Sequence, residues 1–98
     1  MITLSDLHDA TLESISLDWA AAVVRVRFKV HGIGATVLEA NDVFELNCPR
    51  LLPWGPSNSV NSVELQAQTG CQCLTIEMQS GDVLEISCRE VVDLRISE

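Results

Sequence analysis

Residues 71–88 read CQCLTIEMQSGDVLEISC and form the clearest hairpin pattern in the chain. Apolar and polar residues alternate on both sides of Gln79-Ser80-Gly81, a pattern that is typical of half-buried β-strands. A three-residue loop that ends in a left-handed glycine places Ile76 opposite Leu84, so that the two apolar faces coincide. A two-residue loop would turn those faces apart. The stretch therefore predicts an antiparallel hairpin with one buried face.

A second hairpin is predicted nearer the N-terminus. Residues 11–19 and 23–30 alternate in the same way, and pairing Leu17 with Val24 brings both apolar faces to one side. The connection then spans residues 19–22, because alanine is poorly suited to the positive φ of a two-residue turn. Three cations, Arg25, Arg27 and Lys29, share the polar face of the second strand, which we interpret as a solvated surface.

Further strands are expected over 35–40, 43–48, 60–68 and 91–96. Strict alternation in the second of these places Phe44, Leu46 and Cys48 on one face. No stretch has sustained helical periodicity. The sequence thus predicts a single all-β domain over residues 1–98, with about six to eight antiparallel strands in a hairpin-rich sandwich or open barrel.

The charge balance limits the classes of partner. The chain has 14 acidic and 6 basic residues and a net charge of −8. Nucleic acids and anionic membranes would be repelled, because both are bound by neutralising phosphates with Lys and Arg. No apolar run is long enough to span a bilayer, and residues 1–6 lack the features of a secretory signal. We therefore expect a cytoplasmic protein. Its partner is expected to be a protein, and the negative net charge favours a basic one. Exposed sheet edges also allow a homodimer.

The four cysteines do not form a recognisable metal site. Cys71 and Cys73 lack the two-residue spacing of zinc motifs, and strand alternation turns Cys88 to the opposite, core-facing side. Cys48 is expected on an apolar face. The prediction is reduced, partly buried thiols, with no metal and no cofactor.

An enzymatic alternative depends on two histidines. His8 is followed by Asp9, and His31 lies at a glycine-rich turn. A hydrolytic or metal-dependent site would need these groups to converge in one pocket beside a nucleophile or a metal ion. The sequence has no Gly-x-Ser-x-Gly motif, so we expect His8 to make local hydrogen bonds that fix the N-terminal arm.

A stiff central loop over residues 48–61 carries the predicted binding residues. It contains all three prolines of the chain together with Trp54. A tryptophan in such a loop is either a low-entropy anchor for a partner or a ring that plugs one end of the sandwich. If it is an anchor, the binding surface consists of residues from this loop and from the acidic face of the 71–88 hairpin: Trp54, Ser57, Asn58, Glu77 and Glu85.

Three segments resemble a known group of proteins. The opening HDAxLxSI at residues 8–15, PWGPSxSVN at residues 53–61 and EMQSGD at residues 77–82 are similar to segments of small, uncharacterised bacterial all-β proteins. Some of those proteins are associated with toxin-immunity loci. The resemblance implies an acidic, immunity-like protein that neutralises a cationic partner, and it transfers no catalytic residue. The leading hypothesis is a non-enzymatic protein-binding module, and the alternative is a small hydrolase or metal-dependent enzyme that uses His8 and Asp9.

Overall fold

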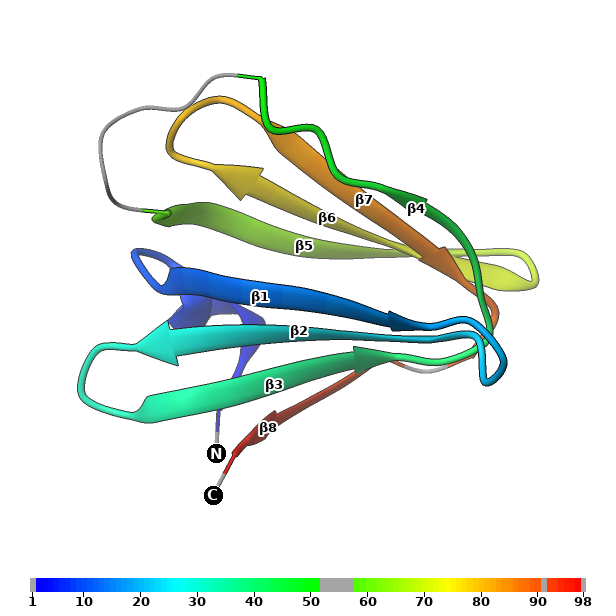
Figure 1. Ribbon diagram of the computed structural model, residues 1–98, viewed down its shortest axis with the longest axis horizontal. Coiled ribbons are helices and arrows are strands. Elements are labelled where there is room, and N and C mark those ends of the chain that lie inside the picture. Colours follow the sequence, from blue (N-terminus) through cyan, green and yellow to red (C-terminus); the bar gives the residue numbers. More distant parts are fainter. Residues whose placement is uncertain (1, 52–57, 91, 98) are drawn as a thin grey trace.

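The computed structural model describes residues 2–51, 58–90 and 92–97. It contains one 3₁₀ turn, η1, and eight strands (Figure 1). Their bounds are η1 Leu4–Leu7, β1 Thr11–Asp18, β2 Val23–Val30, β3 Gly34–Ala40, β4 Val43–Asn47, β5 Val60–Gln68, β6 Cys71–Met78, β7 Val83–Cys88 and β8 Asp93–Ile96. No helix in this part of the chain has the length and apolar character that crossing a membrane requires.

The strands form two antiparallel sheets that face each other. One sheet has the order β1-β2-β3-β8 and the other the order β4-β7-β6-β5 (Figure 1). The side chains between them form one continuous apolar cluster, to which η1 contributes the fully buried Leu7. The fully buried members from the strands include Val24, Val26, Phe28, Leu38, Val60, Leu74, Ile76, Ile86 and Cys88. The predicted all-β fold of six to eight antiparallel strands is confirmed.

Both predicted hairpin registers are confirmed. Leu17 lies opposite Val24, and a four-residue connection joins β1 to β2. Ile76 lies opposite Leu84, and the backbone N–H of Met78 donates to the carbonyl of Asp82 at 2.8 Å, which closes a three-residue loop. In these hairpins the coincidence of apolar faces was sufficient to determine the pairing.

Edge strands β1, β4 and β5 each contain a β-bulge. The extra residues are Glu13, Phe44 and Asn61, each lying where the pairing register shifts by one. A bulge moves the strand out of strict alternation, so apolar residues three positions apart can face the same side. The pairs that reach the interior in this way are Leu12 and Ile15, Val43 and Leu46, and Val60 and Val63.

The bulge in β4 makes one sequence prediction wrong. Phe44, Leu46 and Cys48 do not share a face: Val43 and Leu46 pack on the core, whereas Phe44 is 48% exposed and Cys48 is exposed. Strict alternation failed here because the residue inserted at Phe44 reverses the faces of the preceding part of the strand. The outward Phe44 ring instead lies under the Arg89 guanidinium, 4.4 Å from the ring centroid.

The two halves of the chain have the same strand arrangement. Strands β1, β2 and β3 form a meander in one sheet, after which β4 joins the edge of the other sheet; β5, β6 and β7 form a meander there, after which β8 returns to the first sheet. The exchanged strands also have matching registers. Leu38 pairs with Leu94, and Leu46 pairs with Ile86. The step from Leu38 to Ile86 and the step from Leu46 to Leu94 are both 48 positions. The sandwich therefore has an approximate internal two-fold symmetry.

Backbone hydrogen bonds join the two sheets at both ends of this arrangement. At one end the Asp9 N–H donates to the Val60 carbonyl and the Val60 N–H donates to the Ala10 carbonyl, both at 2.8 Å. At the other end the two inter-sheet crossovers touch, because the Arg89 N–H donates to the Asp42 carbonyl at 3.1 Å. Between these ends, the edges of β1 and β4 diverge.

Candidate functional site

The outer face of the β4-β7-β6-β5 sheet is acidic. By register, Glu64 of β5 and Glu85 of β7 flank Thr75 of β6 in one cross-strand row, and Glu77 and Glu45 lie in the adjacent rows. No Lys or Arg occupies an outward position of these four strands within the described residues. We call Glu45, Glu64, Glu77 and Glu85 the acidic face. Glu77 and Glu85 were predicted to share this surface, whereas Glu64 and Glu45 come from strands whose pairing the sequence did not indicate.

Most cations lie on the opposite side of the molecule. Arg25, Arg27 and Lys29 of β2 and Arg95 of β8 project from the outer face of the other sheet. Arg25 Nε donates to Glu39 Oε2 at 2.8 Å, and Arg95 also reaches that carboxylate, at 3.3 Å. The Arg25 hydrogen bond, with Arg95 beside it, holds the pKa of Glu39 below its usual range. The outer face of this sheet therefore carries both signs of charge, whereas the charged residues at the outward positions of the other sheet are all glutamates. Arg89, which follows β7, lies over Phe44 at the border of the acidic face.

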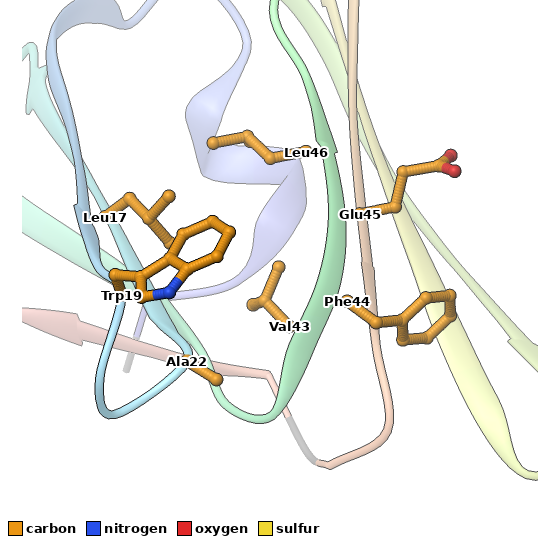
Figure 2. A pocket seen from close by; sticks show the side chains of 7 residues that line it. All are labelled: Leu17, Trp19, Ala22, Val43, Phe44, Glu45 and Leu46. Carbon is orange, nitrogen blue, oxygen red and sulfur yellow. The ribbon is translucent and has the colours of Figure 1, made fainter.

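An open apolar pocket of about 310 Å³ lies between the diverging edges of β1 and β4. We call it the edge pocket; it is lined by Leu17, Trp19, Ala22, Val43, Phe44, Glu45 and Leu46. In Figure 2, Val43 and Leu46 point from β4 toward Leu17 and Trp19, whereas Phe44 and Glu45 point away to the other side of the strand. Through Glu45, the edge pocket is continuous with the acidic face.

Trp19 is the exposed aromatic residue at the rim of the edge pocket. Its side chain is 86% exposed, and the neighbouring Leu17 is 45% exposed. The alternating segment over residues 11–19 included Trp19, but β1 ends at Asp18, and Trp19 begins the connection over residues 19–22, as expected. Its exposed position beside a pocket was not predicted; the signal was a large apolar residue immediately beyond a strand end, followed by three alanines.

The predicted central-loop residues are only partly described. Trp54 and Ser57 lie outside the described residues. Asn58 is exposed, and its carbonyl accepts from the Leu12 N–H at 2.9 Å. At the other side of the loop, the Leu51 N–H donates to Oδ1 of the buried Asp82 at 3.2 Å. Asn58 thus belongs to the contact between the sheets.

His8 and Asp9 belong to a polar cluster that joins the N-terminal segment to β5 and β6. His8 Nδ1 lies 2.6 Å from the Asn61 carbonyl, and Gln79 Nε2 donates to Asp9 Oδ1 at 2.5 Å. The Asn61 amide in turn donates to Glu77. Asp9 adopts a φ of 66°, a left-handed conformation that these contacts hold in place. The cluster connects segments that are distant in sequence. His8 therefore ties the N-terminal arm to β5 through Asn61, and not through the local hydrogen bonds that were expected.

His31 is placed in the exposed turn between β2 and β3, without a hydrogen bond or ion pair to the rest of the described chain. It makes no contact with the His8 cluster that would assemble the pocket required by the enzymatic alternative.

The cysteines are dispersed. Cys88 is fully buried, Cys71 and Cys73 are half-buried on the outer side of β6, and Cys48 is exposed. Burial, with the charges of Cys71 and Cys73, raises the pKa of the Cys88 thiol, which favours the neutral form over a metal-binding thiolate. Within the residues that the structure describes, no group of three or more His, Cys, Asp or Glu side chains is placed to hold a metal ion.

Comparisons of this chain with protein-family models, with curated proteins and with solved structures gave no match. The resemblance to small bacterial all-β proteins stays a prediction.

Proposed function

We propose that this protein is a non-enzymatic module that binds a positively charged protein. The observation that carries the proposal is the acidic face: four glutamates on one sheet surface, while four of the six basic residues of the chain project from the other sheet. An uneven charge distribution of this kind creates a directional field that accelerates encounter with a basic partner and orients it. A charge distribution that served solubility alone would not need to be one-sided.

The edge pocket provides apolar surface that a partner can bury, which the acidic face does not. Exposed ion pairs contribute about 0–1 kcal/mol each, so charge alone gives fast but weak association. Binding energy is concentrated where aromatic residues are buried at the interface, and tryptophan is the residue most enriched at such positions. Trp19, 86% exposed beside an open apolar pocket, is placed to act as that anchor.

A specific version of this function is immunity. An acidic, rigid β-sandwich would neutralise a cationic toxin by covering its basic surface. This version rests on the resemblance of residues 8–15, 53–61 and 77–82 to proteins of toxin-immunity loci.

The proposal is tested by neutralising the acidic face. The variant carries Glu45→Gln, Glu64→Gln, Glu77→Gln and Glu85→Gln, and a matched control with the same net charge carries Asp6→Asn, Asp9→Asn, Glu90→Gln and Asp93→Asn. All four control residues are exposed and lie outside the acidic face. A basic protein captured by the wild type is purified, and its affinity for all three proteins is measured by calorimetry at two salt concentrations.

We expect the acidic-face variant to bind at least about tenfold more weakly and to lose most of the salt dependence, because fewer charges are paired in the complex. The control should stay within about twofold of the wild type. Equal losses in the two variants would contradict a dedicated acidic face, since net charge alone would then explain binding.

A further inference from the structure

We draw no further inference here: the strongest candidate, the open apolar pocket between the edges of β1 and β4, lies beside a strand that adjoins both the carboxylate of Asp18 and the cations of β2, and nothing in the structure shows what covers it.

Discussion

Thr36 places a hydroxyl group in the interior of the sandwich. The residue is fully buried opposite Phe28, and its Oγ1 has no hydrogen-bond partner among the described residues. A buried polar atom without a partner costs about 1–3 kcal/mol, because it has lost its hydrogen bonds to water. The surrounding apolar side chains offer no replacement for those bonds.

Replacing Thr36 by Val should therefore stabilise the protein. Valine has nearly the same shape, so the packing is kept while the unpaired hydroxyl is removed, and we expect a gain of about 1 kcal/mol in the free energy of unfolding. Urea denaturation with an unchanged m-value is the measurement. Thr36→Ser is the control: it keeps the hydroxyl and loses a buried methyl, so it should destabilise. A loss of stability in Thr36→Val would indicate that the hydroxyl is paired.

At the level of elements, the bulges explain how three edge strands keep apolar residues inward. Deleting Glu13 should convert the bulge of β1 to regular pairing, since Leu12 and Ser14 already oppose consecutive residues of β2. We expect a cost below about 1 kcal/mol, as for a surface change. Deleting Ser16 from the regular part of the same strand should turn Ile15 outward and cost about 2 kcal/mol. Chemical denaturation of the two variants checks the contrast, and equal costs would contradict it.

The ion pairs that join Arg25 of β2 and Arg95 of β8 to Glu39 of β3 give a pH-dependent prediction. The pKa of Glu39 is lowered mainly by its hydrogen bond from Arg25, so its contribution is present above the unfolded-state pKa and is lost as pH falls through the lowered, folded-state pKa. The stability difference between wild type and Glu39→Gln should be constant above about pH 6 and shrink on acidification. Thermal unfolding from pH 7 to pH 3 measures it. Glu64→Gln, on the outer face of the other sheet, is the control. A difference that grows on acidification would show the sign to be wrong.

The elements also show how far sequence reasoning reached. Both hairpins could be predicted, down to Leu17 opposite Val24 and Ile76 opposite Leu84, because loop length and the coincidence of faces are local properties. The pairing of β4 with β7 and of β3 with β8 could not, since nothing local marks strands that are distant in sequence as neighbours. The bulge at Phe44 escaped for a related reason: strict alternation has no place for an inserted residue.

The candidate site divides in the same way. Glu77 and Glu85 could be assigned to one surface from the hairpin alone, but Glu64 and Glu45 join them only through tertiary pairing. The edge pocket could not be predicted, because it exists where β1 and β4 fail to meet. Trp54 and Ser57 lie outside the described residues, so their predicted role stays a prediction.

At the scale of the whole molecule, the distribution of charges should make the electrostatic potential around Trp19 negative. We expect caesium to quench Trp19 fluorescence more strongly than iodide in a Trp54→Phe background, because Asp18, Asp42 and Glu45 attract cations and repel anions near the edge pocket. The difference between the two quenchers should fade as salt is raised toward about 1 M, where the Debye length is only about 3 Å. Steady-state quenching, with free tryptophan amide as the control, is the measurement. Stronger quenching by iodide would contradict the assigned field.

The exchange of last strands between the halves has a consequence for the origin of the chain. Neither half contains a complete sheet: residues 1–51 lack the strand that β8 supplies, and residues 52–98 lack the strand that β4 supplies. This is the arrangement expected when the gene of a strand-swapped homodimer is duplicated and fused. Co-expressed halves should assemble and show the β-sheet spectrum of the intact chain, whereas each half alone should remain unfolded by circular dichroism. Independent folding of either half would contradict a common ancestry as an obligate dimer.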